Sequence, residues 1–265
     1  MKELNSTINI TCISTIRTDN LSFSRYCDIL EDKINIRSDF NILPEYCWGK
    51  SSLADILKFI NILRDRRLKT NIIFGTFPFQ LPNNKQKTNN AIILTKTNSI
   101  EYVQKTHVLF EESKSHGITG GINNNVFTFS DINFGVVICA DLWNSQLIKN
   151  LIVNKKIQLL FVPAFTVVPK GYSNYAKYQW YSLSIARSRE FVLPIIIADH
   201  KLNTEKYDVG NATSIADPSV KHESIKKQTD FLVLPDEHGI INYKMDLEKI
   251  NEYRQYRKSQ GLYVF

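Results

Sequence analysis

The sequence predicts an α/β fold. Two observations carry this prediction over its 265 residues. Short runs of apolar, often β-branched residues recur along the chain, with the length and composition typical of buried strands. Between some of these runs, apolar residues recur at helical spacing, as in the stripe formed by Leu53, Ile56, Leu57, Ile60 and Leu63. Strands that alternate with helices along a chain are characteristic of α/β proteins.

The strands are predicted in chain order from these apolar runs. Pro44 ends the second run and Gly75 closes the third, because proline has no backbone N–H and glycine weakens a strand. A number close to ten strands allows either one sheet or two packed sheets. The predicted strands are residues 8–13, 40–43, 71–74, 91–94, 126–129, 135–139, 159–162, 192–197, 231–234 and 240–243.

Helices are predicted where the period of the apolar pattern changes. Ser52, followed by Asp55 three residues later, is a typical start for the helix that carries the apolar stripe. Residues 142–153 and 178–191 are further predicted helices, and Cys27 lies in another. Because no repeat and no low-complexity linker interrupts these elements, we expect a single domain over residues 1–265.

Composition excludes several classes of protein. A hydrophobic fraction of 43% with 22% charged residues is too apolar for a disordered chain. Ten glycines and eight prolines are too few for a collagen-like or low-complexity protein. Four cysteines are too few for a disulfide scaffold, and none of their spacings indicates a zinc site. We therefore expect free thiols in a reducing, cytoplasmic setting.

The formal net charge of +7 does not by itself indicate a partner. The basic residues are scattered, and the cluster of Arg64, Arg66, Arg67 and Lys69 has no interleaved aromatic side chains of the kind that bind single strands. The first residues are too polar for a signal peptide, and residues 191–198 form an apolar run far shorter than a membrane span. We expect neither a nucleic-acid partner nor a membrane partner.

Three segments place reactive side chains at or just after strand ends, where α/β folds hold functional groups. Glu45 follows the strand that Pro44 stops, Lys105 precedes His107, and Cys139 ends the most apolar strand of the chain. Each residue alone also has an ordinary structural explanation: a solvated glutamate, a surface lysine and an inert core cysteine. Their order along the chain is what favours chemistry.

In that order the three segments resemble the carbon–nitrogen hydrolase (nitrilase) superfamily. Residues 43–45 are similar to its strand-Pro-Glu segment, residues 102–110 to its Tyr-x-Lys-x-His-Leu-Phe segment, and residues 135–141 to its Gly-x-x-Ile-Cys-x-Asp segment. The resemblance covers nearly the whole chain. It implies a four-layer α-β-β-α sandwich with two mixed sheets, a Glu45–Lys105–Cys139 triad, a supporting Glu112, and a homodimer or larger homo-oligomer. It implies no metal and no organic cofactor.

The residue types suit hydrolysis of a non-peptide C–N bond, most simply in a small amide or carbamoyl compound. A cysteine thioester divides one difficult step into two easier ones. We expect Cys139 to lie exposed at the strand end, where backbone N–H groups would lower the pKa of its thiol. Glu45 would act as the general base, with its pKa raised by burial and lowered by Lys105. Lys105 and the Ala140 N–H would stabilise the oxyanion.

Substrate recognition is less clearly encoded. Members of the superfamily often carry arginine two residues after the aspartate of the cysteine segment, and this chain has Trp143 there. We assign Trp143 and Tyr46 to substrate binding, while the aromatic residues between Tyr172 and Tyr181 could line the pocket or pack between helices. Acyl transfer and nitrile hydrolysis by the same thioester chemistry stay open, and so does an inactive hydrolase-like binding protein.

Overall fold

The first of two large sheets carries the N-terminal half of the chain. The computed structural model describes residues 7–15, 22–82, 86–122, 125–202, 205–220 and 224–262. The sheet has six strands in the order β14-β1-β2-β3-β4-β5. Its strands β1 to β3 are parallel, and β4, β5 and β14 add antiparallel edges. The bounds are β1 Thr7–Ile13, β2 Phe40–Ile42, β3 Asn71–Phe79, β4 Thr88–Leu94, β5 Ile100–Gln104 and β14 Ile240–Asp246.

The second sheet repeats this mixed pattern, in the order β13-β12-β10-β8-β7-β6. Its central strands β7, β8 and β10 are parallel, with antiparallel strands on both sides. A separate pair, β9 and β11, forms a small antiparallel ribbon. The bounds are β6 Val126–Phe129, β7 Ile132–Val136, β8 Leu159–Pro163, β9 Val167–Pro169, β10 Ile195–Ala198, β11 Tyr207–Val209, β12 Ser214–Ala216 and β13 Leu232–Val233.

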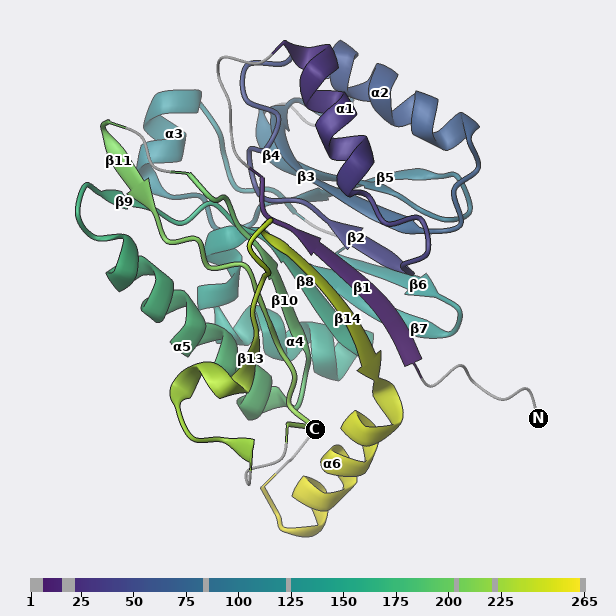
Figure 1. Cartoon of the computed structure of the whole chain (residues 1–265), viewed down its shortest axis with the longest axis vertical. Helices are drawn as coiled ribbons and strands as arrows, with labels where there is room; N and C mark the ends of the chain where they lie inside the picture. The colour runs from purple at the N-terminus through teal and green to yellow at the C-terminus, as the bar shows by residue number, and fades with distance from the viewer. Residues whose placement is uncertain are drawn as a thin grey trace.

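Helices cover the outer faces of the two sheets, so the predicted four-layer α-β-β-α arrangement is confirmed. Helices α1 (Phe23–Lys33) and α2 (Leu53–Asp65) pack on the first sheet, and the Ser52 side chain caps α2 by accepting from the Asp55 N–H. Helices α4 (Ser145–Lys155) and α5 (Ser173–Phe191) pack on the second sheet. Figure 1 shows α1 and α2 on one side of the strands and α5 on the other.

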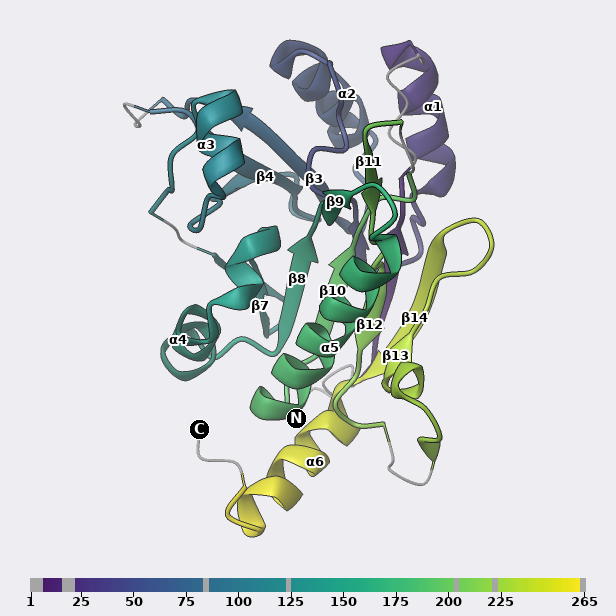
Figure 2. The same ribbon diagram turned by 90° about the vertical axis from the view of Figure 1, so that its left-hand side faces the viewer.

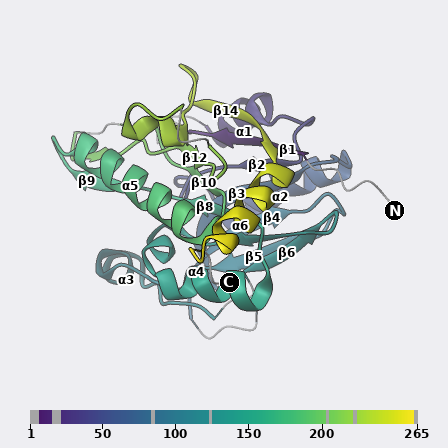
Figure 3. The ribbon, with the colours of Figure 1, turned by 90° about the horizontal axis from the view of Figure 1, so that it is seen from below.

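Two further helices lie at the margins. Helix α3 (Phe110–His116) follows β5, and α6 (Leu247–Ser259) follows β14. Figure 2 shows α6 at the opposite end of the molecule from α1 and α2, and Figure 3 shows it in front of the strands when that end faces the viewer. At the start of α6, the side chains of Leu247 and Ile250 are buried. Within the described residues, no helix is long and apolar enough to cross a membrane.

All ten predicted strands correspond to observed strands, although several bounds differ. The prediction that Gly75 closes the third strand is wrong, because β3 continues to Phe79 through a shift of register between Ile73 and Thr76. Gly75 has a positive φ of 65°, and a Cβ there would collide with the carbonyl oxygen of Pro44. The glycine therefore lets the segment that leads to Glu45 lie directly against β3.

The sequence prediction also missed elements whose pattern is weak. It gave no strand for β5 or for the β9–β11 ribbon, and it did not find α3 or α6. Both helices are rich in charged residues and bury little apolar surface, so neither has a clear apolar stripe. The strand predicted over residues 135–139 ends earlier, at Val136, so Cys139 lies in the turn beyond it. The single domain over residues 1–265 stays a prediction.

The two sheets meet in an aromatic core. The fully buried ring of Phe40 lies 5.0 Å from Phe129, 4.9 Å from Phe134 and 4.9 Å from Phe161, measured between ring centroids. The rings of Phe129 and Phe134 meet Phe40 at steep interplanar angles of 63° and 73°, an arrangement that stabilises the core beyond the free energy of burial alone. This contact fixes the spacing of the sheets and therefore of the strand ends that carry the site.

We predict that Phe40→Ala lowers the free energy of unfolding by about 3–5 kcal/mol, because it leaves a cavity that neighbouring rings cannot fill. Urea denaturation followed by circular dichroism measures the loss. Ile36→Ala is the control, since Ile36 is 62% exposed and its truncation should change stability by less than about 0.5 kcal/mol. Similar losses for the two variants would contradict the assignment of Phe40 to the core between the sheets.

Candidate active site

The candidate site lies where the carboxyl ends of strands from both sheets meet. Glu45 comes three residues after β2, Lys105 directly after β5, and Cys139 three residues after β7. The backbone N–H of Glu45 donates to the carbonyl oxygen of Ala164, at 3.2 Å. Because Ala164 directly follows β8, this bond joins the two sheets at the site. The structure thus brings together the three residues that the sequence predicts as catalytic.

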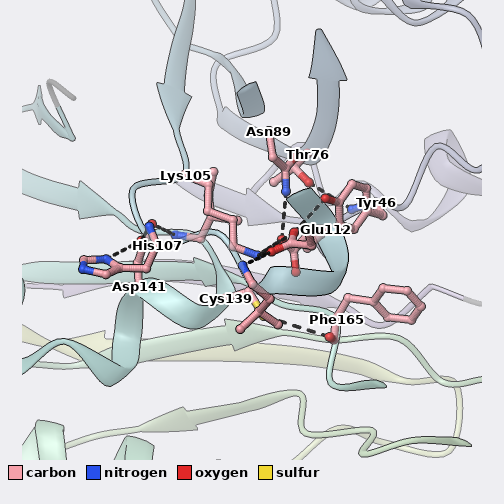
Figure 4. Close-up of polar contacts among 12 residues, drawn as sticks. Tyr46, Thr76, Asn89, Lys105, His107, Glu112, Cys139, Asp141 and Phe165 are labelled. Atoms are coloured by element: carbon pink, nitrogen blue, oxygen red, sulfur yellow. Dashed lines mark hydrogen bonds and ion pairs between the residues drawn. The ribbon is translucent and has the colours of Figure 1, made fainter. Parts of the chain in front are cut away.

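Lys105 is the centre of a buried ion cluster. Its Nζ lies 2.7 Å from Glu45 Oε1 and 2.8 Å from each carboxylate oxygen of Glu112. Figure 4 shows the side chains of Lys105, Glu112 and Cys139 pointing toward one another. Glu112 is itself held by the Tyr46 hydroxyl, at 2.7 Å, and by the backbone N–H of Leu109, at 2.9 Å. Glu112 therefore contacts Lys105 as predicted, and Tyr46 orients Glu112.

Burial and charge set the protonation of this cluster. Burial raises the pKa of Glu45 to about 7, although the ammonium of Lys105 opposes the rise. Burial would lower the pKa of Lys105, but the carboxylates of Glu45 and Glu112 and the thiol of Cys139 raise that pKa above its ordinary value. Lys105 accordingly keeps its positive charge, whereas Glu45 can take up or release a proton near neutral pH.

The two oxygens of Glu45 have different surroundings. Asn89 Nδ2 donates to Oε1 at 2.8 Å, and Lys105 Nζ reaches the same oxygen. The Cys139 thiol lies close to this carboxyl group, and both residues border the larger cavity at this site. Since Oε1 already accepts two donors, Oε2 is the oxygen left to exchange a proton with the thiol. Sequence reasoning missed Asn89, although consecutive polar residues just before an apolar strand were a usable signal.

Cys139 lies in a tight turn with an unusual backbone. Its φ of 45° is in the left-handed region, and it begins the short 3₁₀ helix Cys139–Trp143. Side chains other than glycine adopt this conformation at an energetic cost, and such strain is often kept at functional sites. The strain aims Sγ at the ion cluster, with the carbonyl oxygen of Phe165 at 3.9 Å.

The prediction of an exposed Cys139 with a lowered pKa is wrong. The residue is only 4% exposed, and burial together with the carboxylate of Glu45 raises the pKa of its thiol, more than Lys105 lowers it. The physical reason is that the strand end is enclosed between the two sheets instead of opening to solvent. The resting thiol is therefore protonated, and a base must remove its proton.

Asp141 ties the turn of Cys139 to the segment of Lys105. Its buried carboxylate accepts from the backbone N–H of Ile138 at 3.1 Å and from that of His107 at 2.6 Å. Ala140 occupies the second position of the 3₁₀ helix, where a backbone N–H has no partner within the helix. Ala140 directly follows Cys139 in this turn, and its role as an oxyanion donor stays a prediction.

His200 supports Glu45 from behind. Its Nε2 donates to the carbonyl oxygen of Glu45 at 2.6 Å, and its other ring nitrogen lies 3.2 Å from the hydroxyl of Thr15. The side chain is fully buried after the end of β10. Sequence reasoning missed His200, although the polar pair Asp199 and His200 directly after an apolar strand repeats the signal that identified Glu45.

Two adjoining cavities open at Cys139. The larger, of about 900 Å³, is lined by Glu45, Lys105, Glu112 and Tyr46, and the smaller is about 580 Å³. Both predicted substrate-binding residues border a cavity, Tyr46 the larger and Trp143 the smaller. Of the aromatic residues between Tyr172 and Tyr181, Trp180 lines the smaller cavity; the remaining ones line neither cavity and are Tyr172, Tyr175, Tyr178 and Tyr181.

No group of three or more histidine, cysteine or carboxylate side chains suited to a metal occurs in the described part of the chain. The four cysteines are free thiols. That the reaction needs no metal or organic cofactor stays a prediction, since it rests on the resemblance and on the completeness of the acid, base and nucleophile set described above.

Comparison with solved structures identifies the fold. Saccharomyces cerevisiae Nit3, a member of branch 10 of the nitrilase superfamily, has a TM-score of 0.73 at 19% identity, covering 97% of this chain and 96% of that one. XC1258 from Xanthomonas campestris, a CN-hydrolase superfamily protein, gives 0.71 at 15% identity, with 96% of each chain covered. An amidase from Nesterenkonia sp. gives 0.68 at 14% identity, again with 96% of each chain covered.

Comparison with family models tests the relationship by sequence. A comparison with the curated proteins finds no match. The model of the family described as Carbon-nitrogen hydrolase matches residues 54–255, a span that includes Lys105, Glu112 and Cys139, with Glu45 shortly before it. This span is well over half of the chain, and the structural neighbours share its two-sheet architecture from end to end. The protein belongs to the carbon–nitrogen hydrolase family.

Proposed function

We propose that this protein hydrolyses a small amide or carbamoyl compound through a thioester on Cys139, with Glu45 and Lys105 completing the triad. The observation that carries the proposal is the buried cluster beside the thiol. There a carboxyl group with a pKa of about 7 lies beside the protonated thiol of Cys139, and a lysine holds its positive charge within 2.7 Å of that carboxyl group. A general base tuned near neutral pH is the group that a protonated thiol requires.

In the first half of the reaction, Cys139 Sγ attacks the amide carbon while Glu45 takes the thiol proton. The carbonyl oxygen gains negative charge, which the ammonium of Lys105 and the N–H of Ala140 stabilise. The tetrahedral intermediate then breaks its C–N bond. Glu45 delivers the proton to the departing nitrogen, so ammonia or an amine leaves and the acyl group stays on sulfur as a thioester.

In the second half, Glu45 takes a proton from water, whose oxygen attacks the thioester carbon. The C–S bond breaks, the carboxylic acid leaves, and the proton on Glu45 returns to Cys139. Glu112 keeps Lys105 in place throughout, because both its oxygens lie within 2.8 Å of Nζ. The same groups therefore serve both half-reactions, with the Glu45 carboxyl group changing from base to acid and back.

Similarity to an amidase from Nesterenkonia sp. supports amide hydrolysis over the alternatives. Nitrile hydrolysis and acyl transfer would use the same thioester and differ only in the group that forms or receives it. An inactive binding protein is the less economical alternative, since it would keep a strained cysteine and a buried ion cluster without use. Self-association and a cytoplasmic location stay predictions.

Substitution of the triad should separate the roles. We predict that Cys139→Ala reduces kcat for ammonia release roughly 10⁶-fold, since no nucleophile remains. Lys105→Met should reduce kcat by about 10²–10³-fold or more, through loss of oxyanion stabilisation. Cys27→Ala, on α1 and away from both cavities, is the matched control and should keep full activity. Turnover that survives Cys139→Ala would contradict the thioester.

The pH profile should report the ionisation of Glu45. Because Glu45 accepts the thiol proton only when ionised, we predict that kcat/KM rises about tenfold per pH unit up to about pH 7 and then levels. Lys105 lowers the pKa of Glu45, so in Lys105→Met the rise should move to higher pH. Ammonia release measured between about pH 5 and about pH 9 tests both statements. A rise at the same pH in the two proteins would contradict the assignment.

Alkylation should distinguish Cys139 from the other three cysteines. Cys139 lines both cavities and has Glu45 as the proposed base, whereas Cys27 lines neither cavity and burial raises the pKa of its thiol to about 12. We predict that iodoacetamide labels Cys139 much faster than Cys12, Cys27 or Cys47, and that Glu45→Gln slows this labelling. Peptide mapping by mass spectrometry follows each site. Equal rates at all four would refute an activated nucleophile.

A further inference from the structure

The smaller cavity beside Cys139 has a different chemical character from the catalytic one. It is lined by Val108, Leu109, Ala140, Phe165, Val167, Val168, Ala176, Trp143 and Trp180, together with His107, Asn144, Thr166, Gln179 and Cys139. None of these lining residues is an aspartate, glutamate, lysine or arginine. The larger cavity, in contrast, includes Glu45, Lys105 and Glu112, and adds Lys50 and Lys87.

The polar side chains of the smaller cavity already have partners within the protein. His107 lies 3.1 Å from Asp141 Oδ1 and 2.7 Å from the amide nitrogen of Asn144. The Thr166 hydroxyl donates to Asp199 at 2.5 Å, and Gln179 donates to the Tyr175 hydroxyl at 3.2 Å. These polar atoms are therefore already hydrogen-bonded within the wall of the cavity. A ligand in this cavity consequently meets a surface that is mainly hydrocarbon and aromatic.

The aromatic wall is built in advance. The rings of Trp143 and Trp180 meet edge to face, with centroids 6.1 Å apart and planes at 85°. Arg187 on α5 donates to the carbonyl oxygens of Leu142 and Trp143, at 3.4 and 3.2 Å, and so fixes the turn that carries Trp143. Trp143 nevertheless remains 46% exposed. An exposed indole on a fixed turn offers an apolar face that a bound group can cover.

The positions of Glu45 and Cys139 decide which half of a substrate enters this cavity. The departing nitrogen must face Glu45, and Glu45 borders the larger cavity but not the smaller one. The carbonyl oxygen must face Lys105 and the Ala140 N–H. The remaining substituent of the reacting carbon, the acyl chain, is left on the other side of Sγ, where the smaller cavity begins.

We infer that the Trp143–Trp180 cavity binds the acyl half of the substrate, and that this half carries an aromatic or bulky aliphatic group without charge. The inference rests on the proposed function and narrows its substrate class to amides of apolar carboxylic acids. A cavity of about 580 Å³ is far larger than an acetyl group needs, and its lining offers no lysine or arginine to pair with an acyl carboxylate. The larger cavity releases the amine.

Steady-state kinetics with three amides tests this assignment. We expect kcat/KM for phenylacetamide to exceed that for acetamide and that for succinamic acid by at least about tenfold, the discrimination typical of an apolar pocket. Trp143→Ala should lower kcat/KM for phenylacetamide by about tenfold and leave that for acetamide within about twofold. Trp143→Phe, unlike Trp143→Ala, should keep most of the preference for phenylacetamide over acetamide. Tyr256→Ala, an exposed tyrosine on α6 away from both cavities, is the control.

A second measurement does not require turnover. Aldehydes add reversibly to a thiol: the S–C bond forms, and the thiol proton passes to the aldehyde oxygen. The aldehyde carbon then carries its chain where the acyl chain would lie. We expect phenylacetaldehyde to protect Cys139 from iodoacetamide at a concentration at least about tenfold lower than acetaldehyde or succinic semialdehyde. Trp143→Ala should remove that advantage.

The amide kinetics and the aldehyde protection together distinguish a failure of the apolar acyl pocket from a failure of the proposed hydrolysis. Hydrolysis of acetamide or succinamic acid as readily as phenylacetamide, with equal protection by the three aldehydes, would overturn the apolar acyl pocket and leave the proposed hydrolysis intact. Selective protection by phenylacetaldehyde without release of ammonia from any amide would support the pocket and contradict hydrolysis. An equal loss of kcat/KM for all three amides in Trp143→Ala would show that Trp143 acts on the catalytic groups instead of the acyl chain.

Discussion

The site depends on one buried ammonium. Lys105 is enclosed between the carboxylates of Glu45 and Glu112, and a charge in so dry a place is tolerable only when it is paired and hydrogen-bonded. The pairing is lopsided, with two acids around one base. Two carboxylates around one ammonium favour protonation of one of the two, and burial raises the pKa of Glu45 to about 7. The same imbalance that stabilises the lysine makes the neighbouring carboxyl group a base near neutral pH.

The geometry of that cluster is held by the backbone at its edges. Cys139 and Tyr46 both have positive φ, and each side chain points into the site from a turn after a parallel strand. Asp141 binds the Cys139 turn to the segment of Lys105, and His200 binds the carbonyl of Glu45. These buried contacts offset the strain of the turns. Rigid placement would serve the proposed proton transfer between Cys139 and Glu45, because that step requires a defined geometry.

Cys139 stands at the boundary between two environments. On one side lie the charged groups Glu45, Lys105 and Glu112, and on the other an aromatic wall whose polar side chains already have partners within the protein. An amide has the same division, with a polar reacting group and an acyl chain of variable character. The position of the nucleophile between a charged and an apolar cavity would let the protein bind the two parts of a substrate separately while it attacks their junction.

The sequence alone determined the α/β class and most of the central strands, because apolar runs are local features of the chain. The segments of Glu45, Lys105 and Cys139 were predicted to form one site because, in that order, they resemble those of carbon–nitrogen hydrolases. Tertiary structure decided what local patterns do not contain. Burial between the sheets made the Cys139 thiol protonated instead of acidic, and contacts over long separations brought Asn89 and His200 onto Glu45. Solvent exclusion and contacts between distant strands set pKa values and side-chain positions, and neither exists until the two sheets have packed.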